Sequence, residues 1–291
     1  MELSILFRCD FISKEEFSQR HVIIFSIIVA IVFVLIFGFG FPLILFLNLL
    51  PNDVFNVVGI DYYLNAINNF IAFIVLIAFL KVLHLYRNIS WNFKGIPKGL
   101  LLGFLFIVFT ITQAYLIYSN APSKEIFLNW AGIASGIVYC ISIALWEELL
   151  CRGLILTNMI KKWGHDERGI FKSIILSSII FGCAHIITGI GADMGASLIQ
   201  VCYATVMGIL LGSIYIKTRS LDAAIALHFI LNLPAYLIPY ILPVTNGMDG
   251  SMFIAVLFIF GIFWIFAAYI IAIRTSKEDC EELINQEIST L

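Results

Sequence analysis

Residues 252–273 read MFIAVLFIFGIFWIFAAYIIAI, a stretch that contains no charged side chain. A helix of about 20 apolar residues is long enough to cross the hydrocarbon core of a bilayer. The whole chain of 291 residues has the same character, with 61% hydrophobic residues, 12% charged residues and a mean hydropathy of +1.02. Soluble domains are about 45–50% apolar and about 25% charged. The composition therefore excludes a soluble enzyme, a nucleic-acid-binding protein and a disordered chain.

Seven other segments have the length and composition of a membrane span. The alternating pattern of a membrane β-barrel is absent from them, so we expect helices. The sequence predicts an all-α polytopic membrane protein with about eight transmembrane helices around an intramembrane polar cavity. Short connections indicate a single membrane domain over residues 1–291, with cytoplasmic tails at 1–21 and 276–291. The eight expected spans are 22–50, 64–86, 98–118, 129–151, 170–188, 195–216, 221–241 and 252–273.

The basic residues predict the orientation, because cytoplasmic loops carry an excess of Lys and Arg. Fifteen of the 17 basic residues fall in the N-terminal segment, in every second connection and in the C-terminal segment. The loops on the other side carry only Lys124, and Arg152 lies at or in the membrane. This asymmetry predicts an even number of spans, with both termini in the cytoplasm. The expected outside loops are 52–61, 119–126, 189–194 and 243–251.

Ionisable side chains within spans are costly to bury and therefore suggest function. The span at 129–151 ends with Glu147, Glu148 and, four residues later, Arg152. Residues four apart share a helix face, so Glu148 and Arg152 can pair. Glu147 is turned about 100° away from Glu148. We therefore expect one carboxylate to be neutralised by the arginine and the other to be available as a general base.

Three more polar side chains lie in the spans that follow. His185 lies among the small residues of Gly182-Cys-Ala, and His228 and Asn232 are four apart on one helix face. Pro234 removes a backbone hydrogen bond to the carbonyl of Ile230 and predicts a local opening of the helix. Counting residues from the basic loops places Asn232 nearer than His228 to the depth of Glu147 and His185.

Other catalytic and binding patterns are missing from the sequence. There is no G-x-S-x-G or Ser-Lys pattern of a serine hydrolase and no H-E-x-x-H motif of a zinc protease. The six cysteines form no CxxC pair, so neither a disulfide framework nor a zinc finger is expected.

The order Glu147-Glu148-x-x-x-Arg152, Phe181-x-x-x-His185 and His228-x-x-x-Asn232 resembles the motif set of the CAAX prenyl protease 2 family. That family is part of the wider CPBP group, also called abortive-infection-like intramembrane glutamic endopeptidases. The resemblance covers residues 129–241, which would form the catalytic core. It implies an intramembrane endopeptidase in which Glu147 and His185 activate a water, His228 and Asn232 stabilise the oxyanion, and Glu148 and Arg152 support the site.

The implied partners are a membrane-associated protein or peptide as substrate and the lipid bilayer, with the active site open to the cytosolic side. No cofactor is expected. Three alternatives remain open from the residues alone. The first is a zinc-dependent version of the same peptidase, because two histidines and a glutamate are possible zinc ligands. The second is a catalytically idle membrane immunity protein, and the third is a transporter that uses buried Glu and His as a proton relay.

Overall fold

The computed structural model describes residues 18–38, 40, 58–188, 194–243, 250–275 and 278–280. This part of the chain is helical and contains no β-strand. The helices are α2 (Val22–Phe33), α4 (Ile60–Val82), α5 (Ile96–Leu102), α6 (Phe104–Asn120), α7 (Trp130–Glu148), α8 (Thr157–Trp163), α9 (Glu167–Thr188), α10 (Met194–Thr218), α11 (Leu221–Leu237) and α12 (Gly250–Ile273), with π-helical segments η1 (Val34–Gly38) and η5 (Leu149–Leu156) and single 3-10 turns at Tyr86–Asn88, Phe93–Gly95 and Ile238–Tyr240.

Six of the described helices are long and apolar enough to cross a membrane. A seventh candidate is the broken pair made of Tyr86–Leu102 and Phe104–Asn120, which bend by 64° relative to each other. The first predicted span, 22–50, appears as a shorter apolar helix at Val22–Gly38, and residues 41–50 lie outside the described part. The prediction of a polytopic all-α membrane protein is thus confirmed, with six or seven candidate spans where the sequence suggested about eight.

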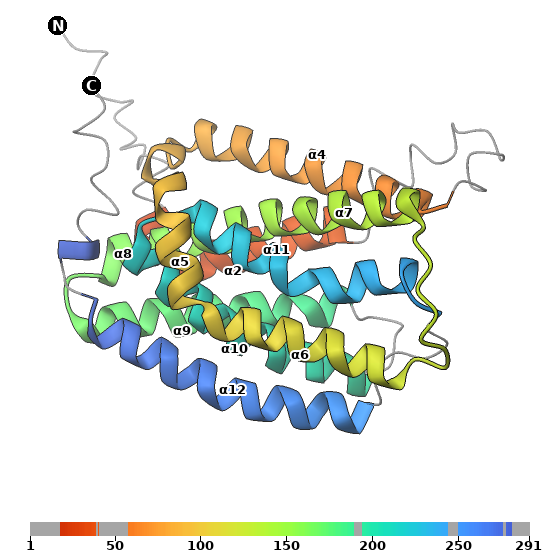
Figure 1. Cartoon of the computed structure of the whole chain (residues 1–291). Helices are drawn as coiled ribbons and strands as arrows, with labels where there is room; N and C mark the ends of the chain where they lie inside the picture. The colour runs from red at the N-terminus through yellow and green to blue at the C-terminus, as the bar shows by residue number, and fades with distance from the viewer. Residues whose placement is uncertain are drawn as a thin grey trace, which may run out of the picture.

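The long helices run roughly parallel or antiparallel, with α4 along one side of the bundle and α12 along the opposite side (Figure 1). Within its most apolar stretch, α10 buries 56% of its residues inside the protein, whereas the corresponding value for α12 is 17%. The exposed face of α12 carries large apolar side chains such as Phe258, Ile262 and Phe266. An outer helix with this composition faces lipid rather than water.

Glycines allow α9 and α10 to pack closely. A Cβ atom added at Gly208 would lie 3.0 Å from Ser178, and one added at Gly182 would lie 2.8 Å from the carbonyl oxygen of Val201. Small residues of this kind let membrane helices approach until their backbones touch. Gly208 and Gly212, which form a GxxxG pattern, therefore pack within the chain.

The turn between α10 and α11 is buried beneath the segment that precedes α5. Leu221 N donates to the carbonyl oxygen of Ser90 at 2.8 Å, and the Ser220 hydroxyl donates to that of Asn92 at 2.6 Å. Ser220 and Leu221 are both 0% exposed. Helix α11 therefore begins inside the protein and not at its surface, which sets the depth of the residues that follow.

Pro234 lies inside α11 without ending it. Its ring leaves the carbonyl of Ile230 without the usual partner in the helix. The hydroxyl of Thr110 on α6 donates to that carbonyl at 3.5 Å. A neighbouring helix thus partly satisfies the backbone group that the proline releases, as is common in membrane helices.

Candidate active site

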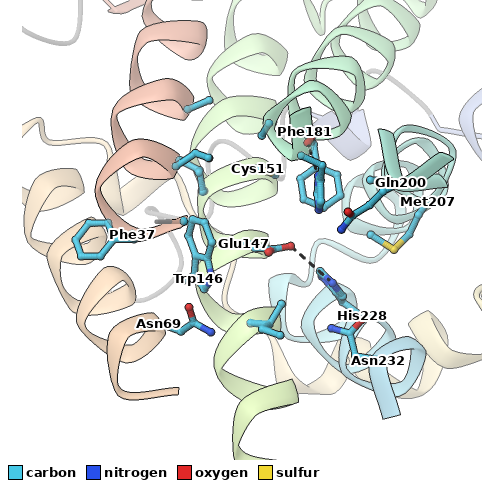
Figure 2. A pocket seen from close by; sticks show the side chains of 18 of the residues that line it. Phe37, Asn69, Trp146, Glu147, Cys151, Phe181, Gln200, Met207, His228 and Asn232 are labelled. Atoms are coloured by element: carbon cyan, nitrogen blue, oxygen red, sulfur yellow. Dashed lines mark hydrogen bonds and ion pairs between the residues drawn. The ribbon is translucent and has the colours of Figure 1, made fainter. Parts of the chain in front are cut away.

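One face of α7 forms a wall of an internal cavity of about 290 Å³. Tyr139, Ile143 and Glu147 follow each other at intervals of four residues, so their side chains share this face. Helices α2, α4, α9, α10 and α11 supply the other walls. The side chain of Glu147 is 18% exposed, and Figure 2 shows it directed toward His228. The cavity therefore contains one accessible carboxylate.

Glu148 has the opposite environment, because its side chain is fully buried. Its Oε1 atom accepts a hydrogen bond from Nη1 of Arg152 at 2.7 Å and another from Nδ1 of His228 at 2.8 Å. The expected pairing of Glu148 with Arg152 is present. The second bond, which joins α7 to α11, was not expected from the sequence. Both bonds involve a charged group, which makes them stronger than neutral hydrogen bonds.

Arg152 is enclosed by groups from three helices. It lies in the π-helical segment that follows Glu148 directly, a form of helix often found at functional sites. Its guanidinium lies 4.8 Å from the ring centre of Phe181 on α9, and Nη2 donates to the carbonyl of Gly208 on α10 at 3.4 Å. The residue is only 2% exposed. Arg152 therefore lies behind the cavity and is not part of its lining.

His228 connects the two glutamates. While Nδ1 binds Glu148, Nε2 lies 3.8 Å from Oε2 of Glu147 (Figure 2). The bond to Glu148 fixes the ring orientation and directs Nε2 toward the accessible carboxylate. The residue count placed His228 shallower than Glu147. The buried start of α11 brings it to the same depth.

His185 lines the same cavity from α9. Its Nδ1 atom lies 3.1 Å from the carbonyl oxygen of Phe181, one helical turn earlier. Because a carbonyl oxygen only accepts hydrogen bonds, this contact requires a proton on Nδ1. The Phe181 ring stands edge-on to His185, with ring centres 5.1 Å apart. The backbone contact and the Phe181 ring thus fix the orientation of the His185 ring.

Asn232 also lines the cavity, one turn after His228 on α11 (Figure 2). The structure therefore brings the four predicted catalytic residues to one cavity. The two predicted supporting residues, Glu148 and Arg152, lie outside its lining.

Among the described residues, no group of three or more His, Cys, Asp or Glu side chains is arranged to hold a metal ion. The zinc alternative requires Glu147, His185 and His228 to converge on one point. These side chains share the cavity without forming such a cluster.

Several cavity residues were not identified from the sequence. Tyr139 and Tyr236 line the cavity from α7 and α11, and Gln200, Tyr203 and Met207 line it from α10. Three asparagines on α4 do so as well: Asn65, Asn68 and Asn69. Only the asparagines could have been identified from the sequence, because three amides at helical spacing are unusual in an apolar span. Tyrosine and methionine are common in membrane helices whether or not they line a site.

Comparison with known proteins supports the resemblance seen in the motifs. No curated protein and no solved structure gave a significant match. The family described as "Type II CAAX prenyl endopeptidase Rce1-like" matches residues 129–234, which include all six predicted site residues. The segment from the start of α7 to Pro234 in α11 is therefore similar to the Rce1-like type II CAAX prenyl endopeptidase family, as the motifs suggested.

Proposed function

We propose that the chain is an intramembrane endopeptidase that hydrolyses a peptide bond of a membrane-associated protein or peptide. The position of Glu147 carries this proposal. It is the accessible carboxylate in a cavity that also contains two histidines and an asparagine, while the Oε1 atom of its buried neighbour Glu148 already binds Arg152 and His228. The match to the Rce1-like family supports a protease of the CAAX type.

In this mechanism Glu147 binds a water and takes one of its protons. The Nε2 lone pair of His185 accepts the second hydrogen bond of that water and orients it toward the substrate carbonyl. Hydroxide adds to the carbonyl carbon and gives a tetrahedral oxyanion. When this intermediate collapses, the C–N bond breaks and the proton held by Glu147 passes to the leaving amine. One water is consumed, and the products are a carboxylic acid and an amine, which then ionise to a carboxylate and an ammonium group.

His228 and Asn232 would stabilise the oxyanion. To donate to it, Nε2 of His228 must carry a proton in addition to the one that Nδ1 donates to Glu148. The resulting imidazolium and Arg152 balance the charges of Glu147 and Glu148, so the group of four is neutral overall. Donors that are fixed before the reaction stabilise a developing charge without reorganisation, which makes them effective in a water-poor cavity.

The distribution of basic residues supports the orientation proposed for the active site. Helix ends at one end of the bundle, including those of α4, α8 and α10, carry Lys81, Lys161, Lys162 and Lys217. We assign this end to the cytosol, so that the cavity receives water and substrate from there. Membrane attachment would concentrate a substrate at this surface. The description of the matching family names a CAAX prenyl endopeptidase, and a prenylated CAAX segment is therefore the substrate class to test first.

The direct test is cleavage by the purified full chain in liposomes. The probes are internally quenched peptides, each made with and without a C-terminal prenyl cysteine. The wild type should cleave at least one of them, and Glu147→Ala should not. Glu125→Ala is the matched control, because Glu125 is exposed in the loop before α7 and should leave the rate unchanged. Equal cleavage by wild type and Glu147→Ala would overturn the proposal.

A further inference from the structure

Three side-chain amides form a polar face on α4. Asn65, Asn68 and Asn69 are spaced three and four residues apart, which places them on one side of the helix, and all three line the cavity. Helix α4 lies outside the segment that matches the Rce1-like family. Polar side chains within a span usually bind another helix or contribute to function. The hydrogen bonds of each amide show which of the three only bind neighbouring helices.

The amide nitrogens are all engaged within the protein. Nδ2 of Asn65 donates to the carbonyl of Asp61 at 2.8 Å, and Nδ2 of Asn69 donates to the hydroxyl of Ser142 on α7 at 3.1 Å. Nδ2 of Asn68 donates to the carbonyl of Phe37 in η1 at 2.8 Å. Asn69 therefore links α4 to α7, and the amide nitrogen of Asn68 links α4 to η1. Helix packing explains why these two donors are present.

The side-chain oxygen of Asn68, unlike these amide nitrogens, has no hydrogen-bond partner among the described residues. The residue is 3% exposed, and its Oδ1 atom accepts no hydrogen bond from any described residue. Most buried polar atoms have a partner, so a buried acceptor without one calls for a ligand or a water. The bond from Nδ2 to Phe37 fixes the plane of the amide and therefore the direction of this acceptor. Asn68, which lines the cavity, thus has a side-chain oxygen that no described residue binds.

We propose that Oδ1 of Asn68 accepts a hydrogen bond from a main-chain N–H of the peptide substrate. The proposal rests on the endopeptidase function proposed above. A peptide that enters the cavity loses water from its N–H groups, and each needs an acceptor to replace it. A volume of about 290 Å³ is at the lower limit for ligand pockets, so it fits a short extended segment.

The position of α4 indicates which part of the peptide is bound. In Figure 2, Glu147, His228 and Asn232 lie to the right of Trp146, Asn69 on α4 lies below it, and Phe37 lies to its left. Asn68 donates to the carbonyl of Phe37, which places its amide on the Phe37 side of Trp146, away from Glu147 and His228. The hydrogen bond would therefore hold a residue that flanks the cleaved bond, and Asn68 would act as a positioning residue that does not touch the reacting atoms.

The test uses peptides in which single amides are replaced by esters, because an ester lacks the N–H. The probes are a fluorescent peptide and its ester variants, each with and without a prenyl cysteine. Binding is measured by fluorescence anisotropy on the full chain in detergent, in a Glu147→Gln background that prevents turnover. At one ester position, binding to this background should weaken about fivefold to tenfold, the effect of losing one hydrogen bond. With Asn68→Leu added, the same ester should change binding less than twofold.

Asn69→Leu is the matched control, because it removes the bond to Ser142 and keeps Asn68. It should lower thermal stability and retain the ester effect. If no ester position depends on Asn68, the acceptor binds only water and the inference is wrong. Cleavage by the wild type is scored separately. Peptides that are cleaved without an Asn68-dependent ester overturn this inference alone, whereas peptides that show the ester effect without being cleaved overturn the proposed function alone.

Discussion

Glu148 and His228 are 80 residues apart in the sequence and form a hydrogen bond of 2.8 Å inside the bundle. This bond links α7 to α11 and directs the other ring nitrogen of His228 toward Glu147. The same carboxylate oxygen also binds Arg152. Glu148 therefore holds the Arg152 guanidinium and the His228 ring in place, while the Glu147 side chain remains partly exposed.

The buried ion pair should appear in stability measurements. Glu148→Gln leaves Arg152 as a buried cation without a counter-ion, and breaking such a pair typically costs about 3–5 kcal/mol. The double variant Glu148→Gln with Arg152→Gln removes both charges and should melt at a higher temperature than Glu148→Gln alone. Thermal unfolding of the purified protein in detergent measures both. If the double variant is no more stable than the single one, Arg152 does not depend on Glu148.

The glycine contact between α9 and α10 should also be essential. In Gly182→Ala the new Cβ atom would lie 2.8 Å from the Val201 carbonyl, too close for a stable contact. Helix α9 must then move, and with it His185, at a cost of about 1–3 kcal/mol for overpacking. Gly261→Ala is the control, because its Cβ atom would meet Val206 only at 3.9 Å. Both variants replace a helical glycine by alanine, so the gain in helix propensity is the same. A lower melting temperature for Gly182→Ala alone therefore reports the clash.

Much of this architecture could be predicted from the sequence, for definite reasons. The spans follow from the length of their apolar runs, because a bilayer leaves the backbone few alternatives. The pairing of Glu148 with Arg152 follows from their spacing of four residues. The convergence of Glu147, His185, His228 and Asn232 on one cavity agrees with the motif order, although their individual roles stay predictions.

Contacts between distant segments could not be predicted in this way. The bond from His228 to Glu148 depends on how far α11 is inserted, and that depends on the buried turn held by Ser90 and Asn92. Counting from Lys217 treated this turn as a surface loop, which made His228 look too shallow. The break between α5 and α6 was similarly hidden within an expected continuous span at 98–118.

The proposed orientation can be tested by cysteine labelling in intact cells. Single cysteines are introduced at Ser123, in a predicted outside loop, and at Lys94, at the basic end, in a background without native cysteines. A membrane-impermeant maleimide should label Ser123→Cys from outside and Lys94→Cys only after permeabilisation. The reverse pattern would invert the orientation and place the basic loops outside the cell.

The metal question has its own test. If Glu147 and the histidines act on water directly, cleavage should survive long treatment with a membrane-permeant chelator. Elemental analysis of the active protein should then find no stoichiometric zinc. Loss of activity together with one zinc per chain, and recovery on adding zinc, would establish the metallopeptidase alternative.

The last prediction separates the roles of His185 and Asn232. His185 would bind the attacking water, so His185→Ala should abolish cleavage while the melting temperature stays close to that of the wild type. Asn232 would act on the oxyanion, which exists only during the reaction. Asn232→Ala should therefore lower kcat by about 10²–10³, the typical effect of losing one oxyanion donor. Its KM should change little, because the ground-state substrate does not depend on that donor. Steady-state kinetics on the same quenched peptides measure both quantities. An Asn232→Ala enzyme with normal kcat and a raised KM would place this residue in substrate binding and leave His228 as the remaining proposed donor.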